Sequence, residues 1–171
     1  MARMWSRRRF LAGSGAAGLA AIAFPRAVRG LGSNEKLAVA CIGTGGMGWT
    51  DLNAVARSPR VSIAALCDID AERLARAAGA FPRARTYADW RELLAKEGGA
   101  VDAVTVSTPD HMHAPIAMTA LRAGKHIYCQ KPLAHDVHEV RQLAAAARGA
   151  KAVTQLGIQH SSGIGARCAV E

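Results

Sequence analysis

A glycine turn directly behind an apolar strand constrains this 171-residue chain more than any other feature. Residues 36–48 read KLAVACIGTGGMG, an apolar, β-branched run that ends in Gly43, Gly45 and Gly48 with the spacing G-x-G-x-x-G. The first glycine permits a tight turn, the second lets backbone approach a pyrophosphate, and the third lets helix and strand pack closely. The following helix offers free N–H groups to phosphates. The pattern therefore predicts a phosphate-binding turn between a strand and a helix.

A second apolar run supports this interpretation because it ends in an acid. Residues 60–67 read RVSIAALC, and Asp68 follows, about twenty residues beyond Gly48. A carboxylate there can accept hydrogen bonds from a ribose diol and repels a 2′-phosphate, so it favours NAD over NADP. NADP stays open as the alternative cofactor, because Arg73 softens this preference if it reaches the pocket. The simpler alternative is a glycine-rich turn followed by an aspartate that caps a helix.

Strand and helix patterns alternate along residues 36–156, joined by short connections. They predict strands at 37–42, 61–67, 85–87, 101–107, 126–129 and 152–156. They predict helices at 47–57, at 71–80, from Asp89 to Gly98, at 114–123, and from Asp136 or His138 to Arg148. This order predicts an α/β fold of the Rossmann type, a doubly wound parallel sheet of about six strands. Ligands bind at the carboxyl ends of such strands, so the loops expected to hold the site are 43–48, 68–70, 107–113 and 130–133.

The basic charge of the chain is concentrated before residue 31. The formal net charge is +9, but six of the 22 basic residues lie there, which leaves 16 basic against 13 acidic side chains over the rest. That remainder has no basic run with interleaved aromatics, so the sequence gives no support to a nucleic-acid partner. Half of the residues are apolar, which is enough for one sizeable core.

The leader has the pattern of a twin-arginine export signal. Residues 6–11 read SRRRFL, and the moderately apolar stretch over 11–24 is too short to span a membrane. The sequence therefore predicts a Tat signal peptide and linker over residues 1–30, the Tat machinery as a partner, and a periplasmic or extracytoplasmic location. An arginine-rich amphipathic helix or an organellar transit peptide is the alternative.

The cysteines and histidines do not form a metal motif. There is no C-x-x-C pair, and His111 and His113 have no further ligand at a suitable spacing, so no metal is expected. Cys41, Cys67 and Cys129 fall at or near the ends of strands, so buried free thiols are expected rather than disulfides.

Several motifs in fixed order carry a family resemblance. Residues 107–143 read STPDHMHAPIAMTALRAGKHIYCQKPLAHDVHEVRQL. Together with GTGGMG over 43–48 they resemble the Gfo/Idh/MocA family of NAD(P)-dependent oxidoreductases, in the neighbourhood of glucose-fructose oxidoreductase and related sugar dehydrogenases. The resemblance covers nearly all of residues 36–156. It implies a domain that binds a nicotinamide dinucleotide, and hydride transfer between that cofactor and a hydroxyl of a sugar or polyol.

The resemblance also implies roles for individual residues. Lys131 matches the lysine of the family's E-K-P motif, which polarises or helps deprotonate the substrate hydroxyl. A solvent-facing lysine before a proline is the alternative. Gln130 stands where the family commonly has Glu, and its amide still offers hydrogen bonds. The expected cofactor-binding residues are Gly43, Thr44, Gly45, Gly46, Met47, Gly48, Asp68, Ser107, Thr108, Pro109, His113, Gln130 and Lys131.

Members of the family carry a second domain that covers the nicotinamide, binds the substrate and often makes the oligomer interface. We expect residues 31–156 to form the dinucleotide-binding domain and 157–171 to be a truncated start of that second domain, the rest of which is absent. The chain alone is then expected to bind cofactor without turning over a small hydroxylated substrate. Two alternatives stay open: a non-catalytic dinucleotide-binding fragment, and the cofactor domain of an NAD-dependent glycoside hydrolase.

Overall fold

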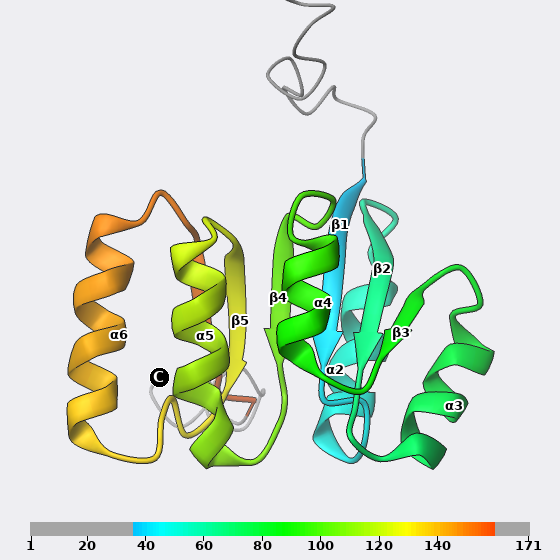
Figure 1. The fold of residues 1–171 in the computed structure, drawn as a ribbon, viewed down its shortest axis with the longest axis horizontal. Coiled ribbons are helices and arrows are strands. Elements are labelled where there is room, and N and C mark those ends of the chain that lie inside the picture. Colours follow the sequence, from blue (N-terminus) through cyan, green and yellow to red (C-terminus); the bar gives the residue numbers. More distant parts are fainter. Residues whose placement is uncertain (1–35, 160–171) are drawn as a thin grey trace, which may run out of the picture. The chain divides into compact units, whose positions relative to one another are not determined.

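Six parallel strands form one sheet in the computed structural model, which describes residues 36–159 (Figure 1). Their order is β3-β2-β1-β4-β5-β6, and each neighbouring pair runs parallel. The strand order reverses beside β1, which confirms the doubly wound α/β arrangement predicted from the sequence. The carboxyl ends of the strands therefore meet along one edge of the sheet.

The elements follow the expected order along the chain. The strands are β1 (Leu37–Ile42), β2 (Val61–Cys67), β3 (Arg85–Tyr87), β4 (Ala103–Val106), β5 (His126–Gln130) and β6 (Thr154–Gly157). The α-helices are α2 (Met47–Ala56), α3 (Ala71–Ala80), α4 (Trp90–Glu97), α5 (His113–Arg122) and α6 (Val137–Gly149). A short 3₁₀ helix, η1 (Asp110–Met112), precedes α5 and was not predicted. None of the helices in residues 36–159 is both long and apolar enough to cross a membrane.

The helix starts differ in a way that matters for the site. Asp70, Asp89 and Asp136 each accept hydrogen bonds from backbone N–H groups in the first turn of α3, α4 and α6. A cap of this kind stabilises a helix by about 1 kcal/mol. Helix α2 instead begins at Gly46, with no side-chain cap and no acid in its first turn. The N–H groups of Gly48 and Trp49 donate to the carbonyl oxygen of Gly45, and those of Gly46 and Met47 are left for an acceptor from outside the helix.

Two hydrophobic clusters cover the opposite faces of the sheet. One packs β-strand residues such as Ile42 and Val104 against Leu93 of α4 and Ile116 of α5. The other packs Cys41 and its strand neighbours against α2 and α3. Helices α4 and α2 accordingly lie on opposite sides of the sheet (Figure 1). This layering orients the strand-end loops toward one shared edge.

The cysteines of residues 36–159 are free and buried, as the sequence predicts. Burial raises the pKa of Cys41 to about 11 and, as the largest cause, that of Cys67 and Cys129 to about 12. These thiols therefore stay protonated and unreactive near neutral pH. The predicted leader over residues 1–30, Cys168 and most of the stretch 157–171 lie outside the described residues.

Candidate cofactor site

Backbone contacts explain two of the glycines in the turn. Gly43 has a φ of +89°, and a Cβ built there would collide with the carbonyl group of Ser107. A Cβ on Gly48 would collide with the carbonyl oxygen of Gly43. Neither backbone group can move aside cheaply, so the turn, β4 and α2 approach one another only because both residues are glycine. At Gly45 the nearest atoms belong to the flexible side chain of Arg73 instead.

A cleft of about 350 Å³ opens beside the turn, at the carboxyl ends of β1, β2 and β4. From the predicted site it is lined by Gly43, Gly45, Asp68, Ser107, Thr108 and Pro109. Ile69, which is 91% exposed, also lines it; it lies in the predicted loop 68–70 but was not among the predicted binding residues.

Two polar groups at this cleft lack hydrogen-bond partners in the described part of the chain. They are the hydroxyl oxygen of Thr108 and the indole nitrogen of Trp90, both fully buried. Buried polar groups in folded proteins nearly always have a partner, and a ligand with polar groups in this cleft is one way to supply it. A dinucleotide, with its ribose hydroxyls, phosphates and amide, fits both the unpaired groups and the glycine turn.

Asp68 joins the glycine turn to the end of β2. Its Oδ2 accepts hydrogen bonds from the backbone N–H of Thr44 at 2.7 Å and from the Thr44 hydroxyl at 3.1 Å, and its Oδ1 accepts from the N–H of Asp70 at 3.0 Å. Thr44 is buried, so the structure places its side chain against Asp68. An ionised carboxylate has about four acceptor positions, which leaves capacity for a ribose hydroxyl.

Arg73 reaches the cleft, which is the condition under which the sequence analysis kept NADP open. Its side chain lies against Gly45, and its Nε pairs with Oδ2 of Asp70 at 3.2 Å. The Arg73 side chain is 61% exposed, so this ion pair contributes at most about 1 kcal/mol and the guanidinium can turn to another anion.

A buried histidine connects the loops that follow β4 and β5. The His113 ring lies with Nδ1 at 2.6 Å from the carbonyl oxygen of Pro132 and Nε2 at 2.8 Å from that of Thr108. The sequence predicts His113 beside the cofactor, and in the structure both ring nitrogens are used by backbone carbonyls. His113 therefore connects the loop after β4, which lines the cleft, to the loop after β5, which does not. The peptide between Lys131 and Pro132 is cis, and the Lys131 side chain is exposed.

Sequence reasoning missed a buried carboxylate on α2. Oδ2 of Asp51 accepts hydrogen bonds from the Ser107 hydroxyl at 2.7 Å and from Nε2 of Gln130 at 2.9 Å. Asp51 lies three residues after Gly48, on the same face of α2. Asp51 brings α2 and two predicted site residues to one point, outside the lining of the cleft.

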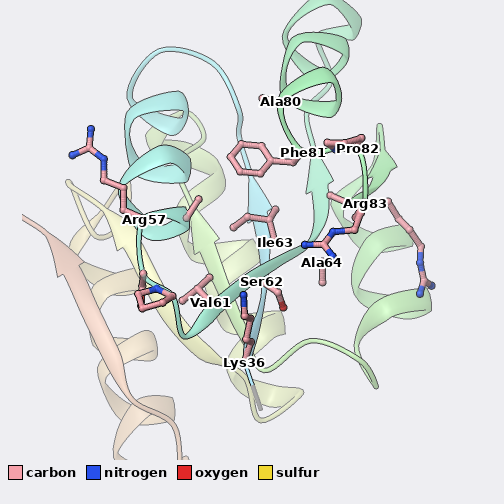
Figure 2. A pocket seen from close by; sticks show the side chains of 15 residues that line it. Lys36, Arg57, Val61, Ser62, Ile63, Ala64, Ala80, Phe81, Pro82 and Arg83 are labelled. Carbon is pink, nitrogen blue, oxygen red and sulfur yellow. The ribbon is translucent and has the colours of Figure 1, made fainter. Parts of the chain in front are cut away.

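A larger hollow of about 660 Å³ lies at the other edge of the sheet (Figure 2). Lys36, Arg57, Arg83 and Arg85 line it, and Figure 2 shows Arg83 reaching over β2 while Arg57 points away. The hollow surrounds the start of β2 and the C-terminal ends of α2 and α3, where unpaired helix carbonyls favour nearby cations. Because dinucleotides bind at the carboxyl ends of the strands, the smaller cleft is the candidate cofactor site. Among the described residues, no three His, Cys, Asp or Glu side chains gather as a metal site would require.

The sheet order, the uncapped α2 and the acid at the end of β2 together define a Rossmann domain of the dinucleotide-binding class. A comparison with protein-family sequence models matches residues 37–158 to the oxidoreductase family with an NAD-binding Rossmann fold. The chain belongs to this family, Gfo/Idh/MocA, as the sequence resemblance indicated.

Curated relatives include dehydrogenases and a glycosyl hydrolase. An inositol 2-dehydrogenase from Rubrobacter xylanophilus is 34% identical over 118 residues, which are 67% of this chain and 33% of the relative. A glycosyl hydrolase family 109 protein from Stenotrophomonas maltophilia is 34% identical over 137 residues, covering 72% of this chain and 29% of the relative. The chain thus spans about a third of the length of the curated relatives it matches.

Solved structures share the fold. The myo-inositol 2-dehydrogenase from Lactobacillus plantarum superposes with a TM-score of 0.73 at 26% identity, over 79% of this chain and 40% of the other. GenD2 from gentamicin A biosynthesis, solved in complex with NAD, gives a TM-score of 0.63 at 35% identity, over 74% of this chain and 36% of the other.

Proposed function

We propose that this chain binds NAD in preference to NADP and is the cofactor domain of an oxidoreductase that acts on a hydroxyl group of a sugar or polyol. The observation that carries the proposal is the position of Asp68, at the cleft beside an uncapped glycine turn. Membership of the family and its dehydrogenase relatives support the reaction class.

The residues divide the work of holding the cofactor. The backbone N–H groups at the start of α2, around Gly45, Gly46 and Met47, would bind the pyrophosphate, because no side chain caps them. Asp68 would accept hydrogen bonds from the adenosine ribose. Ser107, Thr108 and Pro109 would form the wall on the nicotinamide side, since they follow β4 across the switch in strand order. The bound dinucleotide supplies hydride exchange at its nicotinamide carbon.

Lys131 is proposed as the residue that moves the substrate proton. It is exposed at the end of β5, and its backbone N–H donates to Oε1 of Gln130 at 3.2 Å, which fixes the start of its loop. Its amino group would bind the substrate hydroxyl and take or return that proton. In an enzyme that combines this domain with a substrate domain, Lys131→Met is expected to keep NAD affinity and to lower turnover at least about a hundredfold. Unchanged turnover would show that the lysine faces solvent.

Calorimetry with the full chain tests cofactor binding. NAD is expected to bind with micromolar affinity and NADP more weakly, and Asp68→Ala is expected to weaken NAD about tenfold through the lost ribose hydrogen bonds. Because Asp68 also holds Thr44, Asp68→Asn is the matched variant that keeps an acceptor. A folded chain that binds neither dinucleotide contradicts the proposal and favours a relic, or a domain that needs its other half to bind.

The hydrolase relative from Stenotrophomonas maltophilia supports a second candidate, an NAD-dependent glycoside hydrolase. Both candidates use the same cofactor domain, so they separate only at the level of products. In an enzyme that contains this domain, release of free sugar with no net NADH favours the hydrolase, and accumulation of NADH with oxidised substrate favours the dehydrogenase.

We also propose that the protein is exported by the Tat machinery to the periplasm. The support is the SRRRFL pattern and the acid-free apolar stretch after it. Arg7→Lys/Arg8→Lys is expected to keep the protein in the cytoplasm of a Tat-competent host, as measured by cell fractionation. Unaltered distribution of the variant would contradict this route.

A further inference from the structure

Asp51 is a buried acid with no cationic partner among the residues that the structure describes. Its residue is 6% exposed, and no Lys, Arg or His in the described part of the chain forms an ion pair with it. Buried carboxylates are usually paired with a cation, because an isolated charge is costly to bury. Here the side chains that donate to it include two neutral ones, Ser107 and Gln130.

The two donors connect Asp51 to residues of the proposed cofactor site. Ser107 follows β4 and lines the cleft, and Gln130 ends β5. Because Nε2 of Gln130 donates to Asp51, its Oε1 is turned to accept the backbone N–H of Lys131 at 3.2 Å. Asp51 thus sets the orientation of an amide that in turn holds the residue proposed to move the proton.

The negative charge of Asp51 is also felt by its neighbours on the sheet. Burial raises the pKa of the Tyr128 hydroxyl, and the charge of Asp51 and a hydrogen bond with Asp51 raise it further. Tyr128 lies on β5, and Nε2 of Gln130 is 3.4 Å from its hydroxyl oxygen. The field of the carboxylate therefore reaches the strand that leads to Gln130 and Lys131.

Asp51 lies on the side of the sheet edge where the nicotinamide end of the dinucleotide is expected. Asp68 marks the adenosine end at β2, so the nicotinamide end lies across β1, at the ends of β4 and β5. Ser107 and Gln130 are the residues at those ends. A nicotinamide ring is positively charged in its oxidised form and neutral in its reduced form. A fixed, buried negative charge near it favours the oxidised form.

We propose that Asp51 is a positioning residue of the nicotinamide half, and that its unpaired carboxylate makes the site bind oxidised cofactor more tightly, relative to reduced cofactor, than a neutral side chain would. This inference rests on the proposed binding of a nicotinamide dinucleotide.

The test compares the dissociation constants of NAD⁺ and NADH for the full chain and its variants. Asp51→Asn keeps the shape of the side chain and removes the charge, so NAD⁺ affinity is expected to fall about tenfold and NADH affinity less than about threefold. Asp51→Ser, a second neutral variant, is expected to shift the ratio of the two constants in the same direction. Glu92→Gln removes an exposed carboxylate outside the cleft and is expected to leave the ratio unchanged.

Two further variants separate charge from hydrogen bonding. Asp51→Asn/Gln130→Glu exchanges amide and carboxylate across the same contact, so it is expected to restore the ratio toward that of the unmodified chain. Ser107→Ala removes one donor and no charge, so it is expected to weaken both cofactors by a similar factor. Circular dichroism melting checks that each variant is folded before affinities are compared.

The outcomes are distinct. Equal weakening of NAD⁺ and NADH in the folded neutral variants overturns the proposal and leaves Asp51 a structural residue. A ratio that stays shifted in the exchanged double variant overturns it too, and this reading stands even where Asp51→Asn alone is unfolded. Failure of the unmodified chain to bind either form contradicts the proposed function itself, which is a different result.

Discussion

The two halves of the proposed cofactor site are built in different ways. In the adenosine half, at the ends of β1 and β2, the contacts are made largely by backbone: Asp68 accepts N–H groups of Thr44 and Asp70, which lie 24 and two residues away. In the nicotinamide half, at the ends of β4 and β5, side chains meet across long stretches of chain. Asp51 bonds to Ser107 and Gln130, which are 56 and 79 residues away.

This difference decides what a short motif can predict. A glycine turn allows the backbone of neighbouring segments to approach closely. This property depends on the residue type, so it can be read from the sequence. A network of buried side chains depends on which loops the fold brings together, and each member is ordinary when read alone. We therefore expect substitutions in the adenosine half to destabilise the fold through backbone collisions. Substitutions in the nicotinamide half are expected to destabilise it by leaving polar groups unpaired.

The largest effect is expected from Gly48→Ala. The added Cβ would collide with the carbonyl oxygen of Gly43, so the variant is expected to lose about 3 kcal/mol or more of unfolding free energy and to lose measurable NAD binding. Urea denaturation and calorimetry measure the two quantities.

Gly79→Ala is the matched control for that change. Gly79 lies within α3 with open space where a Cβ would stand, so the same substitution is expected to stabilise the protein by up to about 1 kcal/mol. A Gly48→Ala protein as stable as the unmodified chain would mean that α2 and β1 do not pack as closely as the structure shows.

The nicotinamide half is tested by His113→Ala. The change removes the ring whose nitrogens lie at hydrogen-bond distance from the carbonyl oxygens of Pro132 and Thr108, and it is expected to cost about 2 kcal/mol of unfolding free energy. His111→Ala is the control, because its side chain is 63% exposed in the same loop, and an effect within about 0.5 kcal/mol is expected. Equal effects from the two histidines would refute the role of His113 in connecting the loops.

The sequence predicts most of the fold because its signals are local. The bounds of β1, β2, α3 and β3 agree with the predicted ones. Strand β1 ends at Gly43, β2 ends at Asp68, and α3 begins after its Asp70 cap. Helix η1 was missed because three residues carry no periodicity.

The candidate site is less completely predicted. The cleft brings together Gly43, Asp68 and Thr108 as expected, because each follows a strand of a parallel sheet. Asp51 was missed because an acid in a helix is ordinarily taken as solvated, and only the pairing of α2 with Gln130 shows that it is buried. The partner of an amide 79 residues away is a property of the fold and is not written in any local pattern.

A smaller effect is expected in the adenosine half from Asp68→Asn. The amide oxygen still accepts a hydrogen bond, while the charge that repels a 2′-phosphate is removed. The ratio of NADP to NAD dissociation constants is expected to fall about tenfold, which is about 1.4 kcal/mol. Competition calorimetry measures this ratio, and an unchanged ratio would show that Asp68 acts only through its bonds to Thr44 and Asp70.

The smallest effect is expected from Arg73→Ala. This variant tests whether the Arg73 side chain contributes to dinucleotide binding in the adenosine half. The ion pair with Asp70 is exposed, so the unfolding free energy is expected to stay within about 0.5 kcal/mol. NADP affinity is expected to fall about threefold with NAD affinity nearly unchanged, because only NADP offers a phosphate near Asp68.

Arg76→Ala is the matched control on the same helix. Arg76 lies over the Trp49 ring at 4.2 Å and does not line the cleft, so its loss is expected to leave the NADP to NAD ratio unchanged. Tighter NAD binding by Arg73→Ala would contradict the prediction in an informative way. It would mean that the guanidinium lying against Gly45 competes with the pyrophosphate, and that the adenosine half, like the nicotinamide half, depends on where one side chain is held.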